Sequence, residues 1–517
     1  MPRRHIHVTD AAEAPLSAAL RRLRMRLDVH GEFPATARAE AESAAHHPRL
    51  PTAGAAHAPD TTHAPAATPH IPAASRAPEI PHAAETADAT DLPFFTIDPP
   101  GSMDLDQAMF LCRRPGGGFR VHYAIADVAA FVTPGGALDA EAHHRVRTLY
   151  FPDERVPLHP QVLSEDAASL LPDQDRPAVL WQLDLDAYGA LQATSVRRAL
   201  VRSRARLDYA GVQRALDSGR AEEPLALLRT IGLFREELEV ARGGISLNVP
   251  EQEIIEHNGG YTLEYRAPLP AEGWNAQISL LTGMAAAELM LASGTGILRT
   301  LPTAPDGAVA RLRRTAHALG IDWPPHTSYA ALIRTLNPRG AAHAAFLQEC
   351  TTLLRGAGYT VFDGTPPAPA DALHAAVAAP YAHTTAPLRR LVDRYTGELC
   401  LAASAGTEPP QWVRGALPGL PAEMAAGDRL AGQVERECVD LVEAALMRDR
   451  VGELFDAYVI DVQEKNPGHG TVHIDNPAVV GRLEADPAGP PLPLGHRLRV
   501  RLAAADPGYA PVRFIPA

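Results

Sequence analysis

Hydrophobic and polar residues alternate on both sides of one polar loop. The run FFTID, residues 94–98, precedes the loop, and FRVHYAIADV, in which every second residue from Phe119 to Ile125 is large and apolar, follows it after the turn RRPGGGF. A period of two is typical of half-buried strands, and a Gly-rich turn between two such runs indicates a hairpin. We therefore predict a strand, a polar loop and a β-hairpin over residues 109–127.

A helical period is present near the start of the chain. Leucines recur at helical spacing, Asp10 with Glu13 resembles a capping box, and Gly31 can end the helix. PATARAEAESAAHH predicts a second helix. Residues 1–50 are thus expected to form a small helical module, and the pattern leaves open whether it is a helix-turn-helix or a packing or dimerisation element. The leucines are Leu16, Leu20, Leu23 and Leu27.

Further patterns divide the rest of the chain. Residues 51–91 are rich in alanine, proline and histidine, which indicates a linker. Strands mix with long helical patterns, such as AQISLLTGMAAAELMLA and VERECVDLVEAALMRDRVGELF, over residues 92–450. Short β-like runs between Gly/Pro turns over residues 452–517 suit a five-stranded barrel of the OB type. The predicted fold class is α+β.

The composition favours an ordinary globular protein. The chain has 517 residues, 46% of them hydrophobic and 21% charged, which is enough for a sizeable core and about three domains. We find no apolar signal at the N-terminus and no uninterrupted apolar run of ~20 residues. We therefore expect a cytoplasmic protein without membrane contact, and a monomer. Four widely spaced cysteines predict reduced thiols rather than disulfides.

The positive charge comes almost entirely from arginine. The formal net charge is -13, and Lys465 is the only lysine. In RRALVRSRARLDY, Arg202, Arg204 and Arg206 alternate, so a strand would place them on one face, close to Tyr209. Arginines that follow phosphates and a ring that stacks on a base suit single-stranded nucleic acid. A solvated strand face is the more frequent cause of such a pattern.

Three aspartates gather in the polar loop. Asp98, Asp104 and Asp106 lie within FFTIDPPGSMDLDQAMF. Carboxylates held close together repel one another unless a cation lies among them, and oxygen ligands suit Mg²⁺ or Mn²⁺. Two such ions roughly 4 Å apart can activate water for phosphodiester cleavage. The alternatives are a solvated turn or a structural calcium loop, although the spacing is not that of an EF-hand.

These residues carry a resemblance to the ribonuclease II family and its RNB catalytic domain. TIDPPGSMDLDQA resembles the family signature T-I-D, five residues, then D-x-D-D-A. Further blocks follow in family order between residues 92 and 450, and family members typically end in an S1-type OB barrel. The blocks are YAIADVAAFVTPGGALDAEAHHR, LYFPDERVPLHPQVLSEDAASLLPDQDRPA, VRSRARLDYAGV, RGGISLNVPE and YAHTTAPLRRLVDRYTGELC.

The resemblance implies a processive 3'→5' exoribonuclease that takes single-stranded RNA and releases nucleoside 5'-monophosphates with a divalent metal, Mg²⁺ or Mn²⁺. It implies that Asp98, Asp104 and Asp106 bind metal and that Asp106 is the least dispensable. Arg389 matches the arginine at the cleaved phosphate. The further residues expected to contact RNA are Tyr150, Tyr209, Arg206, Arg390 and Glu435.

Two positions depart from the family pattern. Gln107 stands where a fourth aspartate is usual, so we expect it to be a neutral metal ligand and the metal affinity to be weaker. The helical residues 1–50 stand where cold-shock-type barrels are common, and our hypothesis is that they contact duplex RNA or DNA near the channel mouth. A catalytically decayed RNA-binding protein and a DNA nuclease are the rival interpretations.

Overall fold

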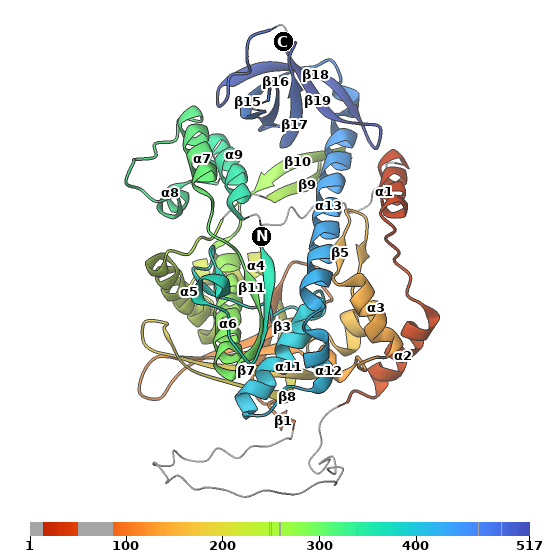
Figure 1. Ribbon diagram of the computed structural model, residues 1–517, viewed down its shortest axis with the longest axis vertical. Helices are drawn as coiled ribbons and strands as arrows, with labels where there is room; N and C mark the ends of the chain where they lie inside the picture. Colours follow the sequence, from red (N-terminus) through yellow and green to blue (C-terminus); the bar gives the residue numbers. More distant parts are fainter. Residues whose placement is uncertain are drawn as a thin grey trace, which may run out of the picture.

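A computed structural model describes residues 14–49, 86–247, 249, 251–257, 260–338, 340–354, 356–463, 465–486 and 489–517. It shows a large mixed body with a small barrel at one end, and helix α13 (Leu420–Met447) runs from the body to the barrel (Figure 1). The predicted capping pair Asp10 and Glu13, and most of the predicted linker, lie outside the described residues. The predicted α+β class with a C-terminal barrel is confirmed.

The body is built on a sheet that closes on itself. Strands β3 and β4 form the predicted hairpin, with Gln107 opposite Ile125 and Arg113 opposite Phe119. Strand β8 is 18 residues long, so it pairs with β7 along its first part and with β2 along its last part. These pairings complete a ring in the order β8, β2, β3, β4 and β7. The bounds are β1 Ala87–Asp88, β2 Phe94–Asp98, β3 Gln107–Arg113, β4 Phe119–Ala126, β7 Asp175–Leu185 and β8 Leu191–Asp208.

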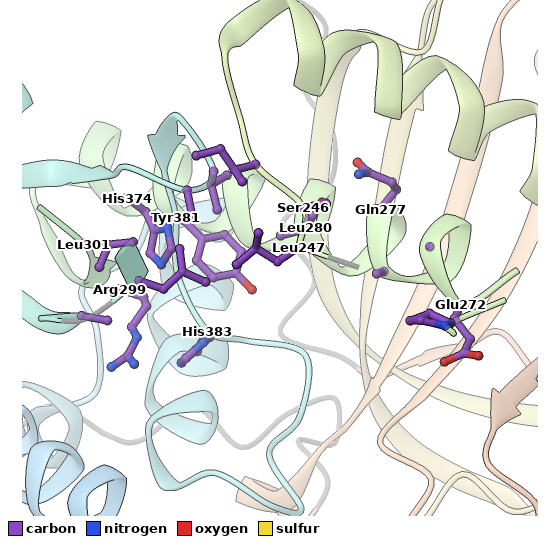
Figure 2. Close-up of a pocket in the computed structure, with 18 of the residues that line it drawn as sticks. Ser246, Leu247, Glu272, Gln277, Leu280, Arg299, Leu301, His374, Tyr381 and His383 are labelled. Atoms are coloured by element: carbon purple, nitrogen blue, oxygen red, sulfur yellow. The ribbon is translucent and has the colours of Figure 1, made fainter. Parts of the chain in front are cut away.

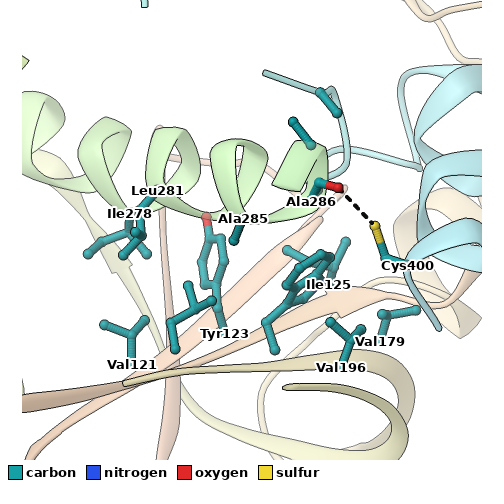
Figure 3. Packing of buried hydrophobic residues seen from close by; sticks show 14 of the residues in the cluster. Val121, Tyr123, Ile125, Val179, Val196, Ile278, Leu281, Ala285, Ala286 and Cys400 are labelled. Carbon is teal, nitrogen blue, oxygen red and sulfur yellow. Dashed lines mark hydrogen bonds between the residues drawn. The ribbon is translucent and has the colours of Figure 1, made fainter. Parts of the chain in front are cut away.

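Helix α6 (Pro270–Ser293) lies across the sheet and forms the centre of the core. Figure 3 shows Ile278, Leu281 and Ala285 of this helix facing Tyr123 and other apolar side chains of the sheet. It is the one described helix that is long and apolar enough to cross a membrane, and 56% of its most apolar window is buried in the protein. The apolar face of α6 is therefore explained by core packing.

The remaining elements of the body surround this core. The helices and helical turns are η1 Val128–Ala130, α3 Ala137–Arg145, η2 Leu163–Ala167, α4 Tyr209–Asp217, α5 Glu223–Arg242, α7 Asp306–Ala318, α8 Tyr329–Thr335, α9 Ala341–Cys350, η3 Thr351–Leu354, α10 Pro369–Ala372, α11 Leu391–Ala405, α12 Gln411–Ala416 and η4 Arg448–Arg450. The strands are β5 Leu149–Tyr150, β6 Arg155–Val156, β9 Glu251–His257, β10 Gly260–Arg266, β11 Thr295–Thr300, β12 Gly358–Asp363, β13 Leu373–His374 and β14 Ala379–Pro380.

The C-terminal barrel is closed and five-stranded, as predicted. Its strands pair in the order β15, β16, β17, β19 and β18. Ala444 and Met447, at the end of α13, lie in the same buried cluster as barrel residues such as Val472 and Phe514. The last turn of α13 therefore packs into the hydrophobic core of the barrel. The bounds are β15 Leu454–Gln463, β16 Asn466–Ile474, β17 Val479–Glu484, β18 Arg497–Asp506 and β19 Ala510–Pro516.

The N-terminus is helical, as predicted, with helices α1 (Ala14–Arg26) and α2 (Ala35–His46). The two helices lie apart and contact different neighbours: α1 packs on α13, and α2 packs on α3 (Figure 1). The helices of a helix-turn-helix contact each other across a short turn. The arrangement therefore favours the packing element, which was one of the two alternatives left open by the sequence.

A buried group of ion pairs indicates where the stability of the body is most sensitive to substitution. Arg198 pairs with Asp127 and Glu398, whose side chains are only 2% and 8% exposed. Replacing Arg198 with methionine leaves two buried carboxylates without their cation, which is expected to lower the free energy of unfolding by about 3–5 kcal/mol. Urea denaturation measures this loss. In the control Arg414→Met, which breaks an exposed pair with Asp363, the urea midpoint should hardly change, and equal losses would contradict the prediction.

Candidate nucleic-acid cleavage site

The three predicted aspartates lie in one loop, residues 98–107, which we call the aspartate loop. Asp98 is the last residue of β2 and lies opposite Asp208 of β8. The loop is fixed to the body because the buried Leu105 donates its backbone N–H to Ser169 Oγ at 2.9 Å. Its carboxylates are thus placed by backbone contacts of the body and are not part of a free surface turn.

Asp106 is buried and contacts the segment that carries Arg389. Its Oδ1 accepts a hydrogen bond of 2.8 Å from the Leu388 N–H, and its Oδ2 lies 3.2 Å from Arg389 Nε. Burial raises the pKa of Asp106 to about 8, while Arg389 and the Leu388 N–H oppose this rise. Burial also raises the pKa of Asp98 to about 6. Asp104 adds to both shifts, so the three carboxylates act on one another electrostatically.

The remaining loop side chains contact protein groups. Asp104 pairs with Arg155 of β6. Gln107 donates its amide N–H to the Thr385 carbonyl and accepts a hydrogen bond of 3.3 Å from the Tyr123 hydroxyl. Among the described residues, no three acidic, histidine or cysteine side chains lie close enough together to hold a metal ion. The positive charge beside Asp104 and Asp106 is instead supplied by arginines.

Arg389 and Arg390 differ in their surroundings although they are neighbours. The side chain of Arg389 is 37% exposed and faces Asp106. Arg390 donates two hydrogen bonds, of 2.9 and 2.7 Å, to the buried carboxylate of Asp393 at the start of α11. The Arg389 carbonyl accepts from the Thr148 N–H at 3.1 Å, so this segment lies beside the strand that leads to Tyr150. Arg389 is therefore the less engaged of the two by protein groups, whereas Arg390 is the one that lines a large cavity.

A cavity of about 1330 Å³ brings several predicted residues together. Tyr150, Tyr209, Arg390 and Glu435 all line it, although they come from β5, α4, the segment before α11, and α13. Tyr209 is fixed at the start of α4, where Asp208 caps the helix and the Tyr209 hydroxyl accepts a hydrogen bond of 3.0 Å from Asn275. The structure thus places both predicted tyrosines on the wall of one large cavity.

One wall of the cavity was not predicted from the sequence. Figure 2 shows Arg299, His374, Tyr381 and His383 gathered on one side of it. Tyr359 completes the group, because its hydroxyl lies 2.8 Å from His383 Nδ1 and Arg299 lies 4.6 Å from its ring. Tyr381 and His383 lie in the segment YAHTTAPLRRLVDRYTGELC, whose resemblance to the family could have indicated them. Arg299 lies in a strand without a motif.

The charge of this wall is carried by arginine. Burial lowers the pKa of His383 well below its ordinary value, and Arg390 and Arg299 lower it further. Burial likewise lowers the pKa of His374 to about 4. Both rings are therefore neutral near pH 7, and they pack against the rings of Tyr359 and Tyr381. A neutral aromatic wall beside fixed arginines suits a nucleic acid chain.

Comparison with known proteins decides the family. The family model described as the RNB domain matches residues 86–403, which is more than half of the 517 residues. The chain belongs to the RNB-domain family. A second model, described as the RNase II-type exonuclease C-terminal S1 domain, matches residues 453–517, which form the barrel. The resemblance stated for the ribonuclease II family is thereby confirmed.

Individual relatives agree with this assignment. Ribonuclease R of Escherichia coli (strain K12) is 28% identical over 477 residues, which cover 83% of this chain and 57% of that protein. The chain therefore spans little more than half the length of this relative. The structure of Mycoplasma genitalium RNase R in complex with ribose methylated single-stranded RNA matches with a TM-score of 0.78 at 18% identity, over 98% of this chain and 78% of that chain. Yeast Ssd1, a pseudonuclease, matches with a TM-score of 0.63 at 16% identity, over 77% of this chain and 50% of that chain. Both structures share the fold.

The predicted arginine stripe of the RNB domain contacts protein groups. Arg202 pairs with Asp175, Arg204 donates to the Thr90 carbonyl at 2.7 Å, and Arg206 donates to the Ser102 carbonyl at 3.2 Å. Arg206 thus lies against the aspartate loop, where its charge opposes part of the rise that burial causes in the pKa of Asp98. A role for Arg206 in RNA binding stays a prediction.

The contacts of Gln107 lead to a prediction for this RNB domain. The variant Gln107→Asp loses the donor to the Thr385 carbonyl and adds a carboxylate beside Asp106, so it should be less stable in EDTA by about 1–3 kcal/mol. Added Mg²⁺ should raise its thermal midpoint more than that of the wild type, because a fourth carboxylate increases the metal affinity. Thermal denaturation against Mg²⁺ concentration measures both effects. Identical metal titrations of the two proteins would contradict the prediction.

Proposed function

We propose that this protein is a processive 3'→5' exoribonuclease that hydrolyses single-stranded RNA to nucleoside 5'-monophosphates. The observation that carries the proposal is the contact between the aspartate loop and the Arg389 segment. The Leu388 N–H that binds Asp106 lies 282 residues further along the chain. The fold thus places a buried carboxylate and a half-exposed guanidinium side by side, and phosphodiester hydrolysis needs both kinds of group.

The cavity provides the groups that would hold the RNA. Tyr150 and Tyr209 line it and can stack on bases, which suits an enzyme that accepts any sequence. Arg390 and Glu435 line the same cavity, where we propose that they contact the last nucleotides. Arg389 would stabilise the charge that develops on the phosphate oxygens, since a planar guanidinium donates two parallel hydrogen bonds.

The aspartate loop fits a divalent metal by its donor chemistry. Asp98, Asp104 and Asp106 offer carboxylate oxygens, which Mg²⁺ and Mn²⁺ prefer, and burial raises the pKa of Asp98 and of Asp106. As they stand, these side chains do not lie close enough together to hold an ion, so binding would require Asp104 to leave Arg155 and the carboxylates to approach one another. When bound, the metal supplies an activated water and neutralises charge on the phosphate. The predicted role of Gln107 as a further ligand falls to its amide oxygen, which accepts from the Tyr123 hydroxyl and has a second lone pair, while the amide N–H donates to the Thr385 carbonyl.

A second candidate is a catalytically decayed RNA-binding protein. Two observations favour it: the Gln107 amide is held by protein groups, and Asp104 is paired with Arg155. Likeness in fold to yeast Ssd1 shows that this architecture occurs in a protein described as a pseudonuclease. The proposed enzyme retains all three aspartates and Arg389, which is why we favour catalysis.

Denaturing gels decide between these candidates. 5'-labelled single-stranded RNA and DNA of the same sequence are incubated with the protein in Mg²⁺, Mn²⁺ or EDTA. Stepwise shortening of RNA alone, only with metal, supports the exoribonuclease. RNA that keeps its full length with either metal supports the decayed protein, and shortening of the DNA instead supports a DNA nuclease.

The wider assignments are proposals of the same kind. We propose a helical module over residues 1–50, a linker over 51–91, a catalytic domain over 92–450 and an RNA-binding S1-like barrel over 452–517. We further propose that the protein acts as a monomer in the cytoplasm. Contact of the N-terminal module with duplex RNA stays a hypothesis, and deletion of residues 1–50 with no change in the degradation of structured RNA would contradict it.

A further inference from the structure

The N-terminal helix α1 packs against the hairpin that carries Tyr150. We call residues 149–156, which comprise β5, β6 and the turn between them, the Tyr150 hairpin. Helix α1, the hairpin and α13 bury their apolar side chains in a single cluster. Tyr150 itself lines the large cavity. The members of the cluster include Leu16, Leu20 and Leu23 of α1, Leu149, Phe151 and Val156 of the hairpin, and Val434, Cys438 and Val439 of α13.

Arg24 joins α1 to the turn of this hairpin. Its guanidinium donates hydrogen bonds of 2.8 and 3.0 Å to the two carboxylate oxygens of Asp153, and its Nε lies 2.9 Å from Glu154. It also lies 5.2 Å from the ring of Phe151. Arg24 is only 9% exposed and the Asp153 side chain 17%, so their contact is shielded from solvent, whereas the Glu154 side chain is about half exposed. A bidentate, part-buried arginine pair fixes geometry more firmly than an exposed pair does.

The other strand of the hairpin leads to the aspartate loop. Arg155 follows Glu154 in the chain and lies opposite Tyr150 in the two-stranded pairing. Its guanidinium pairs with Asp104 and lies 3.0 Å from Glu165. A shift of the hairpin would therefore move Tyr150 and the partner of Asp104 together.

Helix α1 also contacts the C-terminal barrel. At Gly508, in the turn between β18 and β19, an added Cβ would lie 3.3 Å from an Arg22 nitrogen and 3.7 Å from Ala19 Cβ. The Arg22 guanidinium lies 5.5 Å from the ring of Tyr509. In Figure 1, α1 lies beside the part of α13 that is nearer the barrel. The helix thus touches the hairpin, α13 and the barrel.

We propose that α1 is a positioning element for RNA binding, and that Arg24 holds the Tyr150 hairpin so that Tyr150 stays in the cavity wall. The inference rests on the proposed function only in that Tyr150 is taken to contact RNA. Without Arg24, Asp153 and Glu154 repel each other beside an apolar surface, and the hairpin turn moves toward solvent. Arg24 touches no substrate, so its effect passes through Tyr150.

The test uses the full chain in EDTA, so that no RNA is degraded. Arg24→Met is compared with the wild type and with Arg21→Met, which removes the same charge from an exposed position of the same helix. Hydrogen exchange by mass spectrometry measures opening of residues 149–156. Fluorescence anisotropy measures the affinity for a 5'-fluorescein-labelled oligouridylate. For Arg24→Met we expect exchange in this segment to be at least about tenfold faster and RNA binding roughly tenfold weaker, with Arg21→Met unchanged.

A double-mutant cycle shows whether Arg24 acts through Tyr150. In a Tyr150→Ala background, Arg24→Met should weaken RNA binding no further, whereas independent effects would add. Arg24→Lys should restore part of the affinity, because it keeps the charge but not the bidentate contact. If Arg24→Met does not fold, Asp153→Asn combined with Glu154→Gln removes the same ion pairs from the other side.

Unchanged exchange of residues 149–156 in Arg24→Met would overturn the proposal, and so would additive losses of affinity in the cycle. Neither result depends on RNA hydrolysis. If the wild-type protein binds RNA but does not shorten it, the proposed exoribonuclease activity is contradicted. The inference about α1 is still tested by the exchange and affinity measurements.

Discussion

Replacing Asp106 with asparagine is expected to slow the proposed RNA hydrolysis on the order of a thousandfold, because a carboxylate that holds the proposed metal would supply several kcal/mol of stabilisation to the transition state. The fold should survive. Asparagine retains one oxygen that can accept the hydrogen bond from the Leu388 N–H, and it removes a buried carboxylate whose pKa is already raised to about 8 by burial. Single-turnover cleavage of 5'-labelled RNA in Mg²⁺ measures the loss.

The matched control for this variant is Asp175→Asn. Asp175 pairs with Arg202 at the exposed end of the sheet, so the same chemical change there should leave the cleavage rate within about twofold. RNA affinity in EDTA should be retained by Asp106→Asn, since the tyrosines that line the cavity are unchanged. A variant that cleaves at the wild-type rate would show that Asp106 is not a metal ligand in the reaction.

The second large effect is expected at Arg389. Lysine in its place keeps one positive charge near Asp106 but loses the planar pair of donors, so the cleavage rate should fall by about 100–1000-fold, which is typical of losing one donor to the transition state. Because this interaction strengthens only as charge develops on the phosphate, the KM for RNA should change much less than kcat. Steady-state and single-turnover kinetics on the same RNA separate the two constants.

Arg414→Lys is the control for Arg389→Lys. Arg414 pairs with Asp363 at the surface, and both side chains are about half exposed. Its replacement by lysine should leave both kinetic constants unaltered. If Arg389→Lys raised KM by as much as it lowered kcat/KM, Arg389 would bind the RNA ground state and would have no special role at the cleaved phosphate.

Local patterns determined much of the architecture from the sequence alone. The hairpin of β3 and β4 follows from an alternation of apolar residues around a Gly-rich turn, and the C-terminal barrel follows from evenly spaced short runs. The aspartate loop was visible because its three carboxylates lie within nine residues of chain, from Asp98 to Asp106. Such features depend on neighbours in sequence, so one chain is sufficient to predict them.

Only the tertiary structure decided which distant groups meet. The contact between Asp106 and the Arg389 segment joins residues 282 positions apart, and Arg24 meets Asp153 across 129 positions. Arg299 joins Tyr359 in the cavity wall although no motif contains it. The structure also showed that the Gln107 amide is engaged by Thr385 and Tyr123. No periodicity encodes such contacts, because they depend on how the sheet, α6 and α13 pack together, which is a property of the whole fold.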